Sequence, residues 1–195
     1  PDMGPEGLNE FSRYFYPQLD KEGLIIDDRA NGGGNVSPMI LERLSREPYR
    51  LTMRRGSSLI GTVPDAVQVG PKVCLINKYS ASDGDLFPLG LPCAWLGKLI
   101  GTRTWGGIIG ISGPLPYMDG TDIRVPFFTS YDPKTGNWII ENHGVDPDIL
   151  IDNDPIKEWN GEDQQLDRAI EEVMKQLKER KPLAPVPAPR DWSHK

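Results

Sequence analysis

Two short segments of the chain combine residue types that can bind an oxyanion beside a nucleophile. The first, Asn31 to Gly34, ends in three glycines and follows an apolar run at residues 23–26. The second carries Ser82 and follows an apolar run at residues 73–76. Glycine has no Cβ, so its backbone N–H is open to a ligand. A serine at a helix start lies beside exposed N–H groups and the positive end of the helix dipole. The pair favours a site that stabilises an oxyanion, such as that of a peptide being cut.

A phosphate loop, a plain turn and an ordinary N-cap are the simpler interpretations. Both phosphate patterns fail, because Gly34 is followed by Asn-Val-Ser at residues 35–37 and not by Lys-Ser/Thr or a G-x-G-x-x-G spacing. The turn and the cap stay open for each segment taken alone. The ends of parallel strands, however, meet at the edge of the sheet where α/β proteins place ligands. There the amides of Gly34 and Asp83 can converge beside Ser82 as an oxyanion hole.

The elements needed to hold these segments alternate between strand and helix, which predicts an α/β fold. Apolar periodicity predicts strands over residues 23–27, 49–55, 73–77, 99–101, 122–130 and 138–141. It predicts helices over residues 7–18, 38–45 and 163–180, and one beginning near Asp83. Residues 56–70 predict a loop because they carry Gly, Pro and Ser, and Pro88 and Pro92 predict a bend or break in the helix after Asp83.

Two of these helices carry further signals. Ser37 is expected to cap the helix that Pro38 opens. The last helix has an apolar stripe that is expected to pack on the sheet and comprises Leu166, Ile170, Val173, Met174 and Leu177.

Composition predicts one globular domain over residues 1–181, followed by a proline-rich tail at 182–195. The net charge is −6 and no basic tract occurs, which argues against nucleic acid or an anionic membrane as a partner. No apolar run is long enough to span a membrane. Cys74 and Cys93 lack metal-ligand spacing and are predicted to be reduced core residues. No metal or organic cofactor is expected.

Four separated blocks of the chain share their residues with one protein family. They are Asp27-x-Arg29-x-Asn31-Gly-Gly-Gly34, residues 79–85, residues 99–107 and residues 141–148. Together they resemble the tricorn branch of the carboxy-terminal processing peptidase superfamily of serine proteases. The resemblance implies a ClpP/crotonase-like α/β fold, with a sheet and flanking helices. It also implies a serine endopeptidase or oligopeptidase that works through an acyl-enzyme.

The same resemblance implies a role for each group of the site. Ser82 matches the nucleophile, and the amides of Gly34 and Asp83 match the oxyanion hole. Glu141 matches the acidic member of a Ser-His-Ser-Glu tetrad, in which a carboxylate supports the basic histidine. A peptide substrate is expected to add as an extra strand along small residues near the serine. These substrate-binding candidates are Gly33, Gly106, Gly107, Gly110 and Ile111.

The general base is missing from the residues that carry the resemblance. Another branch of the superfamily uses a lysine, but this chain has Gly107 at the corresponding position, and Lys98 comes too early. His143 would share one face of a strand with Glu141, whereas His194 lies in the tail. His143 matches no base position of the family, so a structural role is favoured for it.

The resemblance implies that the base histidine and its partner serine come from a preceding helical domain, beyond a PDZ domain. We therefore expect this chain to be the nucleophile-bearing domain of a longer cytoplasmic protease that forms a homohexamer. One competing hypothesis is a non-catalytic peptide-binding or scaffold module that keeps the fold. Another is a crotonase-like acyl-CoA enzyme, which the serine motif and the Trp105-Gly106-Gly107 block disfavour.

Overall fold

The centre of the molecule is a parallel sheet, seen in a computed structural model that describes residues 2–57, 59–94, 96–111, 113, 115–181 and 183–187. Its strand order is β1-β4-β5-β10, and every neighbouring pair is parallel. The strands are β1 (Leu24–Asp27), β4 (Lys72–Ile76), β5 (Lys98–Gly101) and β10 (Ile149–Leu150). β1 and β4 run side by side, so the segments that follow them leave the sheet at the same edge.

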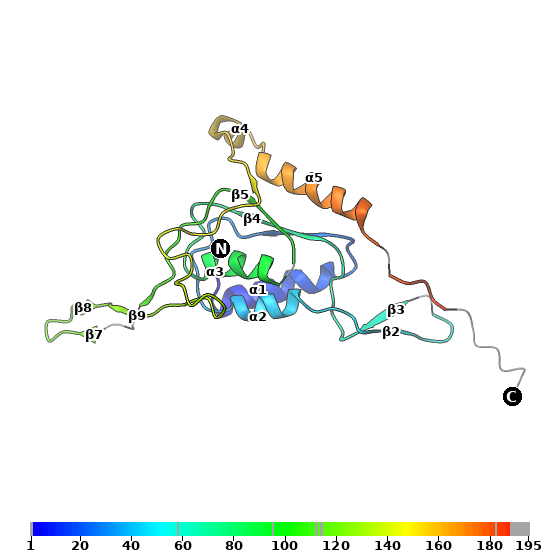
Figure 1. Ribbon diagram of the computed structural model, residues 1–195, viewed down its shortest axis with the longest axis horizontal. Coiled ribbons are helices and arrows are strands. Elements are labelled where there is room, and N and C mark those ends of the chain that lie inside the picture. The colour runs from blue at the N-terminus through cyan, green and yellow to red at the C-terminus, as the bar shows by residue number, and fades with distance from the viewer. Residues whose placement is uncertain are drawn as a thin grey trace, which may run out of the picture.

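Helices cover both faces of this sheet (Figure 1). One face carries α1 (Pro5–Phe15), α2 (Ser37–Leu44) and α3 (Asp83–Cys93), and the other carries α5 (Gln164–Glu179). The 3₁₀ helix η1 (Tyr16–Gln18) extends α1, and the short α4 (Pro155–Trp159) precedes α5. Alternate side chains of a strand point to opposite faces. In β4, Cys74 and Ile76 accordingly pack with the α1–α3 layer, while Val73 and Leu75 pack with α5.

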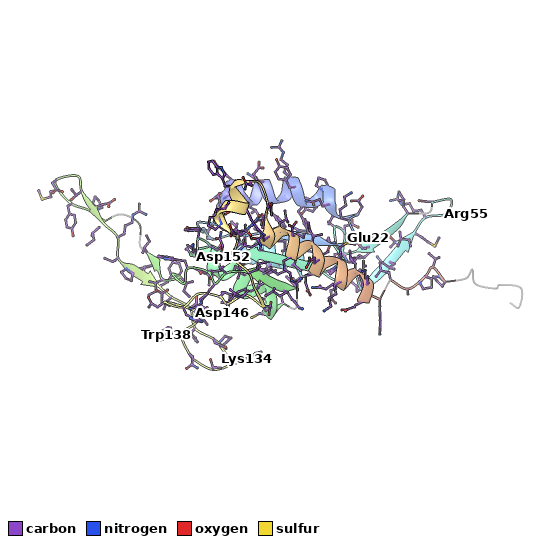
Figure 2. All side chains as sticks on the ribbon, turned by 90° about the horizontal axis from the view of Figure 1, so that it is seen from above. Glu22, Arg55, Lys134, Trp138, Asp146 and Asp152 are labelled. Atoms are coloured by element: carbon purple, nitrogen blue, oxygen red, sulfur yellow. The ribbon has the colours of Figure 1, made fainter. Side chains whose placement is uncertain are left out.

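Two hairpin arms extend from opposite ends of this core (Figure 1). The β2–β3 arm consists of β2 (Arg50–Met53) and β3 (Ile60–Val63). The β6–β9 arm pairs β6 (Gly110–Ile111) with β9 (Pro126–Phe128), and β7 (Leu115–Pro116) with β8 (Asp122–Ile123). Figure 2 labels Arg55 near the outer end of the β2–β3 arm. None of the described helices is long and apolar enough to cross a membrane.

The α/β class and the helices near both termini are confirmed, but one predicted loop and one predicted strand are wrong, and two short elements were missed. The predicted loop over residues 56–70 contains β3, which is stabilised by pairing with β2. Residues 138–141 form no strand, because Trp138 makes only an isolated bridge to Tyr131 and Glu141 begins a turn. β10 and α4 were not predicted, since each is only a few residues long.

Details of three helices also differ from the prediction. α3 continues through Pro88, whose fully buried side chain adds packing that offsets a lost helix hydrogen bond. Cys93 is exposed at the end of α3, whereas Cys74 is buried as predicted. Ser37 lies inside α2, and Val36 takes the N-cap position. On α5, Val173 packs on the sheet but Met174 stays half exposed.

The division of the chain into a domain at 1–181 and a tail at 182–195 stays a prediction. Residues 182 and 188–195 of that tail lie outside the described residues. Residues 183–187 have no helix or strand.

Candidate active site

Ser82 stands at the junction between β4 and α3, in a backbone conformation that side chains rarely adopt. Its φ is 58° and its ψ is −119°, outside the main allowed regions for L-residues. Helix α3 holds it there, because the carbonyl of Ser82 accepts from the amides of Asp85 and Leu86, 2.9 and 3.1 Å away. Ser82 takes the predicted N-cap position, but its hydroxyl makes no capping hydrogen bond. The ordinary N-cap interpretation therefore fails, and the hydroxyl is left for another use.

The glycine turn after β1 lies directly against Ser82. A Cβ added to Gly33 would come 2.6 Å from the Cβ of Ser82 and 3.0 Å from the amide nitrogen of Asp83. Gly33 also has a φ of 97°, which side chains rarely adopt. Glycine at this position is thus what allows the two segments to touch. Gly34 forms a parallel bridge with Met3, which fixes the far side of the turn.

The two amides predicted to form the oxyanion hole have no acceptor. Among the described residues, no hydrogen bond is made by the N–H of Gly34 or of Asp83. The neighbouring amides of Gly33 and Asn35 are both bonded, to the Asn31 side chain and to the Met3 carbonyl respectively. Two such N–H groups, on segments that touch at Gly33 and Ser82, are suited to stabilise a tetrahedral oxyanion.

The Asp83 side chain has a structural role that its sequence position did not reveal. Its carboxylate is buried and accepts from the Ser37 amide, 2.9 Å away, and from the Ser37 hydroxyl. This contact joins the start of α2 to the start of α3. It fixes the residue whose amide faces the glycine turn.

Asp85, in the first turn of α3, joins a second segment to the site through hydrogen bonds. The side chain is completely buried, and its two oxygens accept from the amides of Gly106 and Gly107 at 2.8 and 3.2 Å. The amide of Trp105 also donates to the carbonyl of Ser80, 2.9 Å away. The stretch that follows β5 is therefore held against α3 by a buried carboxylate.

Glu141 is attached to the continuation of that stretch. Its Oε2 accepts from the amides of Ile108 and Ile109 at 2.7 and 3.0 Å. Its Oε1 has no hydrogen-bond partner among the described residues. Glu141 is thus linked through residues 106–109 to Asp85, and through α3 to Ser82. It sits on a turn, with positive φ at the neighbouring Ile140 and Asn142, and not on the predicted strand.

His143 does not join this group. It is exposed, and its Nε2 lies 2.9 Å from Oδ2 of Asp146, while its Nδ1 lies 3.4 Å from Arg103. The turn at residues 141–143 removes the shared strand face that would have brought His143 beside Glu141. His194 lies outside the described residues. Within the described chain, therefore, no histidine contacts Ser82 or Glu141.

The family is decided by a sequence comparison. The model of peptidase family S41 matches residues 2–151 of this chain. The chain belongs to peptidase family S41. The matched range covers β1, the Ser82 turn and the Glu141 turn, so every element of the candidate site falls within it.

Relatives of this S41 chain carry the name tricorn protease. It is 41% identical over 181 residues to the tricorn protease of Thermoplasma volcanium, covering 93% of this chain and 17% of that protein. It is 36% identical over 179 residues to tricorn protease homolog 1 of Streptomyces coelicolor, covering 92% and 17%. The chain thus spans about one sixth of the length of these curated relatives.

Solved structures agree with this assignment. The crystal structure of the tricorn protease superposes with a TM-score of 0.84 at 40% identity, covering 91% of this chain and 17% of that one. The photosystem II D1 C-terminal processing protease shares the fold, with a TM-score of 0.56 at 23% identity over 77% of this chain and 40% of its own. The predicted parallel sheet with flanking helices is therefore the S41 protease fold.

Of the five substrate-binding residues expected in this S41 chain, Gly33 lies against Ser82 with its amide bonded to Asn31, and the other four fall into two groups. The amides of Gly106 and Gly107 both donate to Asp85, so neither is free to pair with an added strand. Gly110 and Ile111 form β6, where Gly110 packs against the Phe128 ring and Ile111 is 56% exposed. Only this second pair lies on a strand, and it pairs with β9 alone among the described strands.

Proposed function

We propose that this chain is the nucleophile-bearing domain of a serine endopeptidase or oligopeptidase. The hydroxyl of Ser82 attacks the scissile carbonyl carbon, and the amides of Gly34 and Asp83 bind the resulting oxyanion. Collapse of the tetrahedral intermediate breaks the C–N bond and leaves an acyl-enzyme on Ser82. Water then attacks the ester carbonyl and releases the acid. The observation that supports this most is that Ser82, whose hydroxyl makes no capping hydrogen bond, packs through its Cβ against Gly33, and that the amides of Gly34 and Asp83 have no acceptor among the described residues.

We further propose that the base is a histidine from a preceding domain of the same polypeptide. That histidine takes the Ser82 proton during attack and returns it to the leaving amine. Glu141 is the group placed to support it, since two amides fix Oε2 while Oε1 has no partner among the described residues. The relatives are about six times as long as the matched segment, which leaves room for such a domain.

The remaining features of the proposal follow the resemblance to the tricorn branch that the sequence motifs carry. The substrate is a peptide, and the preceding part of the polypeptide includes a helical domain with the histidine and its partner serine, and a PDZ domain. We propose a homohexamer in the cytoplasm. The alternative is a peptide-binding or scaffold module that keeps the S41 fold without catalysis.

Labelling with a fluorophosphonate tests the proposal. The full-length protein that contains this chain, and this chain alone, are treated with the probe, and the adduct is located by peptide mapping. We expect an adduct on Ser82 in the full-length protein, its loss in Ser82→Ala and its retention in Ser45→Ala. We expect weak labelling of the isolated chain, because no histidine among the described residues contacts Ser82 or Glu141.

Each other outcome decides against part of the proposal. A folded full-length protein that takes no label would favour the binding module. Strong labelling of Ser82 in the isolated chain would show that the base lies within these residues, with His143 the first candidate.

A further inference from the structure

Asp28, the residue after β1, has a buried carboxyl group that the proposed mechanism does not use. The residue is only 4% exposed. Its Oδ1 accepts from Nδ2 of Asn31 at 2.7 Å, whereas Oδ2 is buried and has no hydrogen-bond partner in the described part of the chain. Its backbone carbonyl accepts from the Ser80 hydroxyl at 2.8 Å. An unpartnered buried carboxyl oxygen is costly, so its presence beside the glycine turn needs an explanation.

Asn31 connects Asp28 to both segments of the site. The residue is 3% exposed, and its side-chain oxygen accepts from the Gly33 amide at 3.0 Å. Its backbone carbonyl accepts from the Ala81 amide at 2.8 Å, next to Ser82. One residue therefore bonds to the glycine turn with its side chain and to the serine turn with its backbone.

The direction of the Asn31 side-chain amide depends on Asp28. An asparagine presents an oxygen on one side and an NH₂ group on the other. Only one orientation gives the Gly33 N–H an acceptor and the NH₂ group an acceptor at the same time. The reversed orientation would place NH₂ against the Gly33 N–H, with two donors facing each other. The Asp28 carboxyl selects the first orientation, because its Oδ1 is an acceptor and therefore has to face the NH₂ group of Asn31 and not the Asn31 side-chain oxygen.

We propose that Asp28 is a positioning residue, which through Asn31 sets the direction of the Gly33–Gly34 backbone beside Ser82. The inference rests on the proposed function, since it concerns the turn that presents the oxyanion-hole amide of Gly34. Asp28 does not touch the substrate. It orients the side-chain amide of Asn31, and the oxygen of that amide holds the glycine turn through the N–H of Gly33.

The neutral form of the carboxyl is sufficient for this task. Burial raises the pKa of Asp28 to about 8, and the nearby carboxylates of Asp27 and Asp85 act in the same direction. The neutral acid keeps a carbonyl oxygen for Asn31 without placing an unpaired charge in the interior. Asparagine has the same shape and also carries a carbonyl oxygen, so the Asp28→Asn variant should hold the Asn31 side-chain amide in the same orientation.

The test compares four variants in the full-length protein that contains this chain. Removal of the acceptor in Asp28→Leu, or of the bridging amide in Asn31→Leu, is expected to slow fluorophosphonate labelling of Ser82 about 10- to 100-fold, as for a displaced oxyanion-hole donor. Asp28→Asn should label within about threefold of the unsubstituted protein, since the oxyanion amides keep their positions. Gln68→Leu is the matched control, because Gln68 is also a buried side chain with one unpartnered atom.

Hydrogen exchange at residues 29–34 gives a second readout that does not depend on catalysis. Exchange should become faster in Asp28→Leu and stay unchanged in Asp28→Asn and Gln68→Leu. If the unsubstituted protein takes no label, the proposed function fails and exchange alone decides the positioning role. Equal labelling and exchange in Asp28→Leu and the unsubstituted protein would overturn the inference, as would equal losses in Asp28→Asn and Asp28→Leu. Asn31→Leu carries the test if Asp28→Leu does not fold.

Discussion

The edge of the parallel sheet and the two hairpin arms are held together by different contacts. At the sheet edge, the buried carboxyl groups of Asp83 and Asp85 accept hydrogen bonds from backbone amides of distant segments, and that of Asp28 accepts from the nearby Asn31 side chain. On the arms, large apolar side chains are exposed, as with Leu59 at 80% and Phe127 at 78%. Long-range polar contacts thus fix the candidate site from within, whereas local strand pairing holds the arms.

This difference suggests that function at the sheet edge depends on the exact positions of side chains and amides, whereas function of the arms depends on the surface that they expose. Isolated two-stranded hairpins are marginally stable in water, and contiguous exposed apolar surface is typical of interaction sites. We therefore expect substitutions at the sheet edge to affect chemistry and folding, and substitutions on the arms to affect association.

The largest expected effect comes from a methyl group at the contact between the two site segments. Gly33→Ala would place a Cβ 2.6 Å from that of Ser82 and would force a side chain into a φ of 97°. Labelling of Ser82 by a fluorophosphonate should fall at least about 100-fold, because the oxyanion amides are displaced. Gly56→Ala, on the β2–β3 arm, is the control, since its φ is 78° but nothing lies within 4 Å. Comparable losses in both variants would mean that backbone strain, and not contact with Ser82, is responsible.

Loss of the carboxylate that joins α3 to residues 106–107 should be next in size. Asp85→Ala leaves the buried amide of Gly106 and the partly buried amide of Gly107 without their acceptor, and should lower the free energy of unfolding by about 2–4 kcal/mol. Urea denaturation measures the change. Asp122→Ala, on the exposed strand β8, is the control and should change it by less than about 0.5 kcal/mol. A small effect at Asp85 would show that the segment after β5 is held by other contacts.

The pH dependence of stability distinguishes the buried carboxyl of Asp28 from ordinary surface carboxylates. Its pKa is raised from 3.8 to about 8 in the folded protein, so between these pH values the folded state keeps a proton that the unfolded state has released. The contribution of Asp28 to the free energy of unfolding therefore decreases as pH rises from about 4 to about 8. Asp28→Asn removes this dependence and should become progressively more stable than the unsubstituted protein over that range.

Denaturation midpoints at several pH values between these limits test the effect. Asp163 provides a control in which the pH dependence of stability has the opposite sign. Desolvation alone would raise its pKa, but hydrogen bonds from Arg29, Leu166 and Asn153 lower it to about 2. Its stabilising contribution is present above its unfolded pKa and is lost as pH falls toward 2. Parallel stability curves for Asp28→Asn and the unsubstituted protein would contradict the assignment of a raised pKa.

The smallest effects on folding are expected on the arms. Leu59→Ser and Phe127→Ser should each change the free energy of unfolding by less than about 0.5 kcal/mol, because both side chains are already exposed. The same variants should reduce the association of the full-length protein with other copies of itself or with other domains, as measured by sedimentation velocity. A loss of stability without any change in association would place these side chains in the folding of the domain itself.

The sequence predicted the parts of the site that depend on local signals. The triple glycine and Ser82 each follow an apolar strand, and their meeting follows from a parallel sheet. The carboxylate contacts could not be predicted in the same way, because Asp83 bonds to Ser37, 46 residues away, and Asp85 bonds to Gly106, 21 residues away. Such pairings depend on the packed arrangement of α2, α3 and the segment after β5.

The wrong prediction of a strand over residues 138–141, which end at Glu141, has a different cause. The apolar residues Trp138, Ile139 and Ile140 imitate a strand, but the positive φ of Ile140 ends any extended run and begins a turn. That turn directs the Glu141 carboxylate to the amides of Ile108 and Ile109. Tertiary hydrogen bonds therefore overrode the local strand preference. The roles assigned to Ser82, Gly34, Asp83 and Glu141 in catalysis stay predictions until the labelling experiments are done.

The spacing between Ser82 and Asp85 has a consequence for how this region can change in evolution. Ser82 is the N-cap of α3 and Asp85 belongs to its first turn, so the length of the chain between them sets the angle between the serine and the carboxylate. One inserted residue would rotate Asp85 by about 100° around the helix axis and turn it away from Gly106. Length variation should therefore be absent between these two positions. It should be common at the tip of the β2–β3 arm, where Gly56 has no close neighbour.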